Sequence, residues 1–333
     1  MRNNVLAFGE PGAEAAAFGG SPQPGLAPVA QAEAFCGAGD LNALPQSLKM
    51  LVANYRELDV RYDPNYRAVW CKATPIGPPS FTRSMVSELN QLHKGVMAAK
   101  ATALVPDETS PLFYVVSSGL KGIFNLGGDL QNFIRLVTAR DRDGLLDYAH
   151  ACVELIYDID QSLGSKVLTV CVVQGDALGG GLEAALSFNV MIAEKGSKMG
   201  LPESLFNAFA GMGAYSLLSR KIGPVEAERM IMSGRIYLAE ELHEMGVVTI
   251  LAEPGRGLEE ARNFVADNYA KHGLLLALNK VRRRVTPITY EELEEVTDIW
   301  VDNVLELAPS DLRRMELLAK AQLRRISDQT RNS

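Results

Sequence analysis

The chain has 333 residues, of which 47% are hydrophobic and 22% are charged, and its formal net charge is −7. This is the composition of an ordinary folded protein, and the acidic balance argues against a general nucleic-acid surface. No apolar run reaches the roughly 18 residues that a membrane span needs. The 4 cysteines and 4 histidines are scattered without metal-ligand spacing, so we expect neither a metal nor a cofactor, and the cysteine usage fits a reducing cytoplasm.

The composition changes along the chain and divides it into three parts. Residues 1–44 are rich in Ala, Gly and Pro without a sustained period, so we expect a mostly disordered extension that is not a secretory signal. Residues 45–272 alternate apolar runs with amphipathic stretches, which is typical of an α/β fold. Residues 273–333 read as a helical region, with a break at Thr286-Pro287.

The hydrophobic periodicity predicts the following elements in chain order. The expected strands are 59–63, 68–72, 111–118, 167–173, 188–193 and 247–252, with a short extended stretch at 197–203. The expected helices are 82–100, 129–163 with a break near 141–144, 182–188, 211–222, 224–232, 239–245 and 257–272. Residues 119–128 are expected to form a loop.

The most informative stretch joins a strand to a helix through three consecutive glycines. Residues 167–173 are apolar and β-branched, and the glycines at 179–181 directly precede a helical pattern. The first N–H groups of a helix lack intrahelical partners and carry partial positive charge, so this corner suits an anion. Glu183 lies in the first turn of that helix. The alternative is a purely structural tight turn with a Glu favoured by the helix dipole.

Another glycine corner, at Gly127-Gly128, also opens a helix; in chain order it is the first corner, and the one at 179–181 is the second. If the two corners face each other, the N–H groups of Gly128 and Gly180 can bind one oxygen from two sides, as an oxyanion hole for a thioester enolate. Glu203, on a turn after Pro202, can bring a second carboxylate to the same place. Two carboxylates can remove one proton and deliver another, provided that their surroundings push the two pKa values apart.

An ordered set of motifs resembles the crotonase (enoyl-CoA hydratase/isomerase) superfamily. These motifs are Gly127-Gly128-Asp129-Leu130, residues 175–183, Met199-Gly200-Leu201-Pro202-Glu203 and Gly211-Met212-Gly213. The resemblance covers roughly residues 58 to 272. It implies a crotonase-like ββα spiral core with a C-terminal helical region, assembled as a trimer or as two stacked trimers. It also implies an oxyanion hole from Gly128 and Gly180, with Glu183 and Glu203 as the catalytic pair.

Within that superfamily the chain is most similar to the diffusible signal factor synthases, bacterial enzymes that make cis-2-unsaturated fatty acid quorum-sensing signals. The motifs that carry this similarity are residues 124–130, 145–149, 199–206, 211–216 and 297–302. The similarity implies a dehydratase for a 3-hydroxyacyl thioester on acyl carrier protein that then acts as a thioesterase and releases the free acid. It makes Leu178, Gly179, Met212 and Trp300 candidates for an acyl pocket.

Two loops depart from the pattern of hydratases that use coenzyme A. Residues 164–167 lack the usual Lys-Pro, and residues 73–80 lack the asparagine-rich pattern, which favours a carrier-protein thioester. Two other functions stay open: a hydratase or isomerase that leaves a coenzyme A thioester intact, and a protein that binds a signalling partner such as a sensor kinase receiver domain. Which glutamate is the acid and which is the base also stays open.

Overall fold

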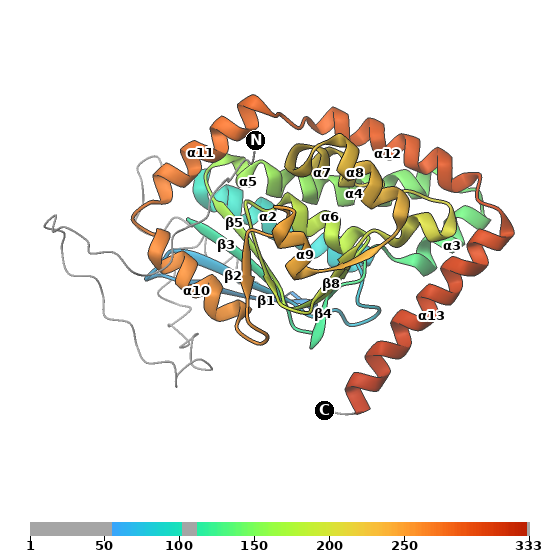
Figure 1. The fold of residues 1–333 in the computed structure, drawn as a ribbon, viewed down its shortest axis with the longest axis horizontal. Helices are drawn as coiled ribbons and strands as arrows, with labels where there is room; N and C mark the ends of the chain where they lie inside the picture. The colour runs from blue at the N-terminus through green and yellow to red at the C-terminus, as the bar shows by residue number, and fades with distance from the viewer. Residues whose placement is uncertain (1–54, 102–111, 332–333) are drawn as a thin grey trace, which may run out of the picture. The chain divides into compact units, whose positions relative to one another are not determined.

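The computed structural model describes residues 55–101 and 112–331, so the extension predicted at 1–44 lies outside the described residues. Figure 1 shows the arrangement of the elements. The strands are β1 (Leu58–Asp63), β2 (Ala68–Ala73), β3 (Phe113–Ser118), β4 (Gly122–Asn125), β5 (Leu168–Val173), β6 (Gly175–Leu178), β7 (Val190–Glu194), β8 (Lys198–Gly200), β9 (Ile236–Leu238) and β10 (Ile250–Ala252). The helices are α2 (Arg83–Ala101), α3 (Leu130–Thr138), α4 (Arg142–Asp160), α5 (Ser162–Ser165), α6 (Gly180–Ser187), the 3₁₀ helix η3 (Pro202–Phe206), α7 (Ala214–Ile222), α8 (Pro224–Ser233), α9 (Ala239–Glu244), α10 (Gly257–Asn268), α11 (His272–Val285), α12 (Tyr290–Leu305) and α13 (Pro309–Arg331).

The strands form two sheets. The larger one has the order β1-β2-β3-β5-β7-β10, and the smaller one has the order β4-β6-β8-β9. The hairpin predicted at 59–63 and 68–72 is confirmed, because β1 and β2 pair antiparallel from Leu58↔Ala73 to Asp63↔Ala68. Strands β3, β5 and β7 join the large sheet and are each followed by a strand of the small sheet, whereas β9 joins the small sheet before β10 joins the large one. The predicted α/β fold with a ββα spiral core is therefore confirmed.

The large sheet is buried on both faces, as the continuous apolar runs of β3 and β5 require. On one face, Tyr114 and Cys171 join the main hydrophobic core with helices α2, α4 and α6. On the other face, Phe113 and Val170 pack with Phe264 of α10. Alternate residues of one strand thus serve two separate cores, because successive side chains of a strand point to opposite faces.

The small sheet determines where the glycine corners lie. Strands β4, β6 and β8 are parallel neighbours, with Ile123 opposite Asp176 and Ala177 opposite Met199. Adjacent parallel strands end at the same edge of a sheet, which is where α/β proteins place ligand sites. The segments that follow these three strands contain Gly128, Gly180 and Glu203 respectively. The pairing of three short strands therefore brings together residues that lie far apart in the sequence.

Several short elements differ from the expectations. Strand β4 lies within residues 119–128, where a loop was expected. The second glycine corner follows β6 rather than the strand at 167–173, because the chain leaves the large sheet after β5 and pairs again in the small one. Strand β9 was not expected, and the C-terminal helical region has a second break between α12 and α13. Strands of three or four residues are too short for a periodic pattern to be visible.

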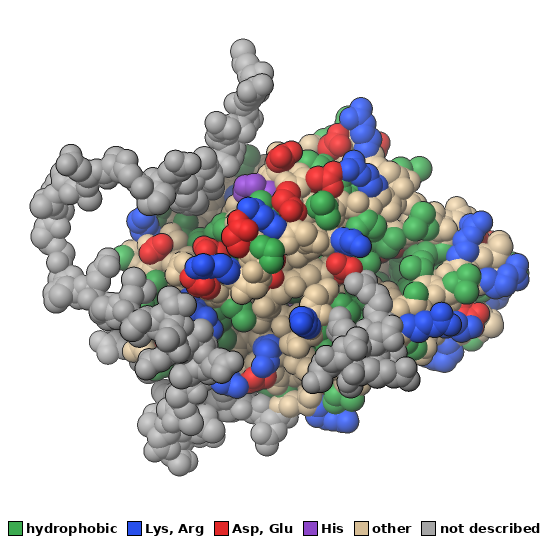
Figure 2. All heavy atoms as spheres, turned by 60° about the horizontal axis from the view of Figure 1, so that its bottom comes forward, with side chains coloured by type: hydrophobic (Ala, Val, Ile, Leu, Met, Phe, Trp, Pro, Cys, Tyr) green, Lys and Arg blue, Asp and Glu red, His purple; other side chains and the backbone are tan. Residues whose placement is uncertain are grey.

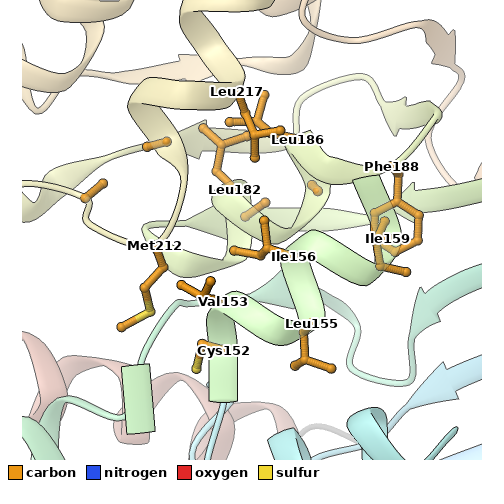
Figure 3. Packing of buried hydrophobic residues seen from close by; sticks show 14 of the residues in the cluster. Cys152, Val153, Leu155, Ile156, Ile159, Leu182, Leu186, Phe188, Met212 and Leu217 are labelled. Carbon is orange, nitrogen blue, oxygen red and sulfur yellow. The ribbon is translucent and has the colours of Figure 1, made fainter. Parts of the chain in front are cut away.

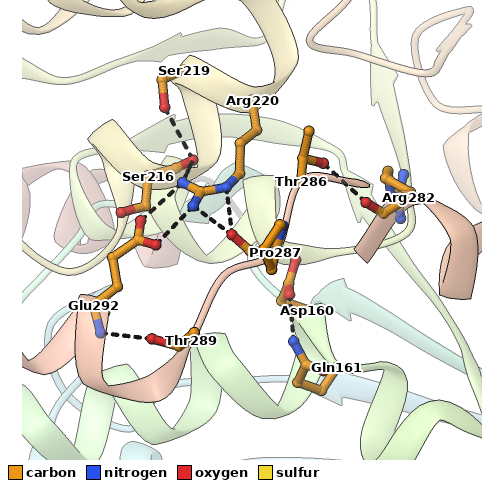
Figure 4. A network of polar contacts seen from close by, with 10 residues as sticks. All are labelled: Asp160, Gln161, Ser216, Ser219, Arg220, Arg282, Thr286, Pro287, Thr289 and Glu292. Carbon is orange, nitrogen blue, oxygen red and sulfur yellow. Dashed lines mark hydrogen bonds and ion pairs between the residues drawn. The ribbon is translucent and has the colours of Figure 1, made fainter. Parts of the chain in front are cut away.

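The C-terminal helices pack against the core. Figure 4 shows Arg220 of α7 bound to Glu292 of α12 and to the carbonyl of Pro287. Its guanidinium donates to Glu292 Oε1 at 2.9 Å and to Glu292 Oε2 at 2.7 Å, and its Nε donates to Pro287 O at 3.0 Å. Paired hydrogen bonds of this kind fix orientation as well as distance. Among residues 55–101 and 112–331, no helix is long and apolar enough to cross a membrane.

Candidate active site

The two glycine corners face each other at the ends of β4 and β6. A Cβ atom placed on Gly180 would lie 3.4 Å from the backbone nitrogen of Gly128, and one placed on Gly127 would lie 3.1 Å from the nitrogen of Gly180. The backbone nitrogens of Gly128 and Gly180 therefore belong to segments in direct contact, and α6 begins at Gly180 with its unpaired first N–H groups. This arrangement suits an oxyanion hole for a carbonyl oxygen.

The first corner is held by hydrogen bonds that involve β4, α4, α13 and the loop residue Phe81. The Gly127 N–H donates to Asn125 Oδ1 at 2.7 Å, and Phe81 N–H donates to the Gly127 carbonyl at 2.8 Å. The Tyr148 hydroxyl of α4 donates to the Phe81 carbonyl and accepts from the Asp129 N–H at 3.3 Å. On the far side, the Leu126 carbonyl accepts from Gln322 Nε2 of α13 at 3.0 Å. The corner is thus fixed before any ligand arrives.

Glu183 is oriented by the turn at residues 211–213. Its Oε1 accepts hydrogen bonds from the N–H groups of Met212 at 2.8 Å and Ala214 at 3.1 Å. The side chain is buried, at 3% exposure. Burial raises the pKa of Glu183 above the ordinary range of a carboxyl, and the two N–H groups act in the opposite direction by favouring the charged form.

Glu203 lies on η3 beside the second corner. A Cβ atom on Gly179 would lie 2.4 Å from Glu203 Oε1, so Gly179 at φ +54° leaves the space that this carboxyl occupies. The other oxygen, Oε2, is buried and has no hydrogen-bond partner among the described residues. Burial raises the pKa of Glu203, and the nearby charge of Glu183 raises it further. Like charges this close do not both ionise readily, so the pair keeps one proton to higher pH than separate carboxyls do.

The two carboxyls have different surroundings, which push their pKa values apart. Glu183 has two N–H donors that stabilise its charge, whereas Glu203 has an unpartnered oxygen and a charged neighbour. These surroundings favour the shared proton on Glu203 over Glu183, because the pKa of Glu203 is raised by burial and by the charge of Glu183. This difference, which the sequence left open, gives the pair one proton donor and one proton acceptor.

A cavity of about 140 Å³ joins these groups. Its lining includes both glutamates, both oxyanion-hole glycines and all four acyl-pocket candidates, which are Leu178, Gly179, Met212 and Trp300. Every site residue predicted from the sequence thus contributes to one cavity. The remaining wall is largely apolar and comes from α3, η3, α12 and α13.

Helix α12 supports the turn that orients Glu183. The Thr297 hydroxyl donates to the Gly211 carbonyl at 3.0 Å, and both groups are buried. A Cβ atom on Gly211 would lie 2.2 Å from Trp300 Cγ, so only glycine allows the indole to pack there. Two side chains of the C-terminal motif at 297–302 therefore contact Gly211, in the turn that orients Glu183.

Sequence reasoning assigned no role to Tyr148, Asn125 or Gln322, which hold the first corner. Tyr148 lies in a motif that carries the family resemblance, but its hydroxyl acts on Phe81, 67 residues away. Gln322 is 196 residues from its partner Leu126. No local pattern signals contacts at such separations, because they depend on how the helices pack.

The enoyl-CoA hydratase/isomerase family model matches residues 86–286. The chain therefore belongs to the enoyl-CoA hydratase/isomerase family. It is 29% identical over 153 residues to the glyoxysomal fatty acid beta-oxidation multifunctional protein MFP-a of Brassica napus, covering 46% of this chain and 21% of that protein. It is 33% identical over 169 residues to the fatty acid oxidation complex subunit alpha of Pseudomonas syringae pv. tomato, covering 50% and 22%. The chain thus matches only about a fifth of the length of these curated relatives.

Solved structures share the fold. The enoyl-CoA hydratase of Bacillus halodurans superposes with a TM-score of 0.66 at 17% identity, over 78% of this chain and 99% of that one. An enoyl-CoA hydratase/isomerase of Xanthobacter autotrophicus Py2 superposes with a TM-score of 0.66 at 20% identity, over 81% of this chain and 96% of that one. DspI of Pseudomonas aeruginosa superposes with a TM-score of 0.59 at 21% identity, over 74% of this chain and 96% of that one.

Proposed function

We propose that this protein catalyses the reversible loss of water from a 3-hydroxyacyl thioester, with Glu183 and Glu203 as the acid/base pair. The observation that carries the proposal is the meeting of two buried carboxyls with unequal surroundings and the facing Gly128 and Gly180 nitrogens in one cavity. The thioester oxygen binds between the two glycine N–H groups. Removal of a C2 proton by one carboxyl gives an enolate that these groups stabilise, and the other carboxyl protonates the departing C3 hydroxyl.

We further propose that the protein hydrolyses the unsaturated thioester and releases a cis-2-unsaturated fatty acid signal. After dehydration, a carboxylate of the same pair takes a proton from a water molecule, whose oxygen attacks the carbonyl carbon held at the oxyanion hole. The tetrahedral intermediate then breaks its C–S bond, and the carrier thiolate leaves with the proton that the carboxyl had taken, which yields the free acid. The motifs shared with diffusible signal factor synthases support this step, and residues from four of them line the site, among them Gly128, Glu203, Met212 and Trp300.

A second candidate function is a hydratase that leaves a coenzyme A thioester intact. The family match over residues 86–286 favours it, because the family description refers to enoyl-CoA substrates. The departures at residues 73–80 and 164–167 favour an acyl carrier protein thioester instead. Figure 2 shows Lys and Arg side chains interspersed with Asp and Glu side chains over one face of the molecule. The choice of carrier is therefore an experimental question.

We also propose that the protein assembles as a homotrimer or a dimer of trimers. Helix α11 exposes Leu274, Leu278, Val281 and Val285, with exposures of 50–72%. Their spacing places them in one stripe along the helix, which is an apolar surface suited to burial against another copy. Leu278→Glu together with Val281→Glu should lower the mass measured by light scattering to that of the monomer. Unchanged mass would exclude α11 from the interface.

The function is tested by mass spectrometry of the purified protein mixed with 3-hydroxyacyl-acyl carrier protein, and separately with the coenzyme A thioester. Release of free 2-unsaturated acid supports the synthase, and its double-bond geometry is read by chromatography against cis and trans standards. Interconversion of thioesters without free acid identifies a hydratase. No turnover of either thioester would contradict both proposed enzymatic functions. Calorimetry would then measure whether the protein binds a receiver domain.

A further inference from the structure

Phe133 of α3 contacts the first glycine corner directly. A Cβ atom placed on Gly128 would lie 2.5 Å from Cε2 of Phe133 and 2.8 Å from its Cζ. The edge of the ring therefore lies against the backbone of Gly128, where a side chain would force the two apart. The Phe133 side chain is buried, at 7% exposure, and close packing around it leaves the ring little room to move away.

Phe133 also packs against Trp300 of α12. The two rings meet edge to face, with centroids 5.1 Å apart and an angle of 63° between their planes. The indole in turn lies against Gly211, because a Cβ atom on Gly211 would lie 2.2 Å from Trp300 Cγ and 2.3 Å from its Cβ. Gly128 and Gly211 thus each contact one ring of the same aromatic pair.

The turn at 211–213 is held between this aromatic pair and the core. Its Met212 N–H donates to Glu183 Oε1. A Cβ atom on Gly213 would lie 3.4 Å from Cγ2 of Ile156 on α4. Figure 3 shows Met212 and Ile156 in one cluster of buried side chains. Because the turn is packed on both sides, a displaced indole also displaces the N–H group that orients Glu183.

The proposed reaction needs a fixed separation between the oxyanion hole and the Glu183 carboxyl. In the substrate, C2 is bonded to the carbonyl carbon, so the distance from C2 to the carbonyl oxygen cannot adjust. The Gly180 donor lies on the same helix as Glu183, which fixes these two relative to each other. The Gly128 donor precedes α3, so its distance from Glu183 depends on packing between elements.

We propose that Phe133 is a positioning residue, which forms with Trp300 a spacer that sets the distance between the Gly128 N–H group and Glu183. A shorter side chain at position 133 lets the corner and the 211–213 turn approach each other, and a longer one drives them apart. Both changes lower the rate for acyl groups of every length, because the reacting atoms are common to all of them. This inference rests on the proposed dehydration of an acyl thioester.

The first test measures kcat and KM for dehydration of 3-hydroxybutyryl, 3-hydroxyoctanoyl and 3-hydroxydodecanoyl thioesters, each on acyl carrier protein and on coenzyme A. Phe133→Leu shortens the spacer, and Phe133→Tyr lengthens it at Cζ. Each should lower kcat by roughly tenfold or more with all three acyl groups, and should change KM less than kcat. A loss that grows with acyl length would overturn the proposal, because a residue that only lines an acyl site acts on the tail.

The matched control is Leu136→Ala on the same helix. Leu136 is buried but is absent from the lining of the active-site cavity, so this variant should lose stability and keep the wild-type kcat. An equal loss of kcat in Leu136→Ala would show that the effect comes from general loosening of α3 and would overturn the proposal. If Phe133→Leu does not fold, as judged by circular dichroism, Phe133→Tyr provides the same comparison.

A second readout does not depend on turnover. Labelling methionine with ¹⁵N gives an amide resonance for Met212, which Met212→Leu assigns. Because this N–H donates to Glu183, the resonance should move in both Phe133 variants and stay in place in Leu136→Ala. An unmoved resonance in the Phe133 variants would overturn the spacer. A moved resonance, in a protein that dehydrates neither carrier's thioester, would support the spacer and contradict the proposed function.

Discussion

The N–H of Met212 donates a hydrogen bond to Oε1 of Glu183 at 2.8 Å. Met212 also lines both the active-site cavity and a second, smaller cavity of about 70 Å³. One residue of the 211–213 turn therefore orients the Glu183 carboxyl through its backbone and lines two cavities. The orientation of the Glu183 carboxyl therefore depends on the conformation of the 211–213 turn.

A methyl group at Gly179 should disable the site without unfolding the protein. In Gly179→Ala the new Cβ lies 2.4 Å from Glu203 Oε1, so the carboxyl must move. A displacement of about 1 Å in a catalytic group costs roughly a hundredfold in rate, which kcat/KM for the thioester will show. Gly196→Ala is the matched control, because Gly196 also has positive φ but meets nothing within 4 Å. Equal losses in both variants would attribute the effect to backbone strain.

The pH dependence of stability should reveal the raised pKa of Glu203. A carboxyl whose pKa is higher in the folded state binds its proton more tightly there, so wild-type stability falls as pH rises above the ordinary carboxyl range. Glu203→Gln removes this loss. Its free energy of unfolding should exceed that of the wild type by at least about 1 kcal/mol at pH 9, and the difference should shrink toward pH 5. Urea unfolding at both pH values measures it, and a difference independent of pH would contradict the assignment.

Loss of the Tyr148 hydroxyl should loosen the first glycine corner. Tyr148→Phe leaves the Phe81 carbonyl and the Asp129 N–H without this partner, and Phe81 in turn holds the Gly127 carbonyl. We expect kcat to fall roughly tenfold with little change in KM, because the oxyanion donors act mainly in the transition state. Tyr157→Phe on the same helix is the control and should keep wild-type kcat. A change confined to KM would show that Tyr148 acts on binding instead.

Helix α12 should be anchored by Arg220. Its bidentate pair with Glu292 and its bond to Pro287 are half-buried, with the two side chains 26% and 33% exposed. Arg220→Ala should cost roughly 1–2 kcal/mol in the free energy of unfolding. The exposed pair of Arg229 and Glu226 on α8 offers the comparison. Arg229→Ala should cost less than about 0.5 kcal/mol. Similar melting temperatures for the two variants would refute an anchoring role.

The sequence predicted the long elements and the extended stretch that contains β8, and it missed β4, β6 and β9, which help to assemble the site. The helix at 82–100 and the strands at 111–118 and 167–173 have strong periodic or apolar patterns, and the structure confirms them as α2, β3 and β5. Strands β4, β6, β8 and β9 have three or four residues each, so their pairing arises from the spiral rather than from local preference.

The sequence identified the residues of the candidate site but not how the two carboxyls share their protons. Glu183 and Glu203 were recognised through glycine corners and motif order. Their unequal protonation depends on the N–H groups of Met212 and Ala214, which lie about 30 residues further along the chain. The smaller cavity that Met212 lines had no signal in the sequence, because most of its walls are apolar residues that resemble any other core.

The measurement that tests the central claim most directly follows the ultraviolet absorbance of a 2-enoyl thioester as it forms from its 3-hydroxyacyl precursor. It compares the wild type with Glu183→Gln, Glu203→Gln and the double variant. If the carboxyls act as one pair, each single variant should lose at least about a hundredfold in kcat, and the double variant should be no slower than the worse single variant. Wild-type rates in either single variant, with both proteins folded, would contradict the assignment of this pair to the chemistry.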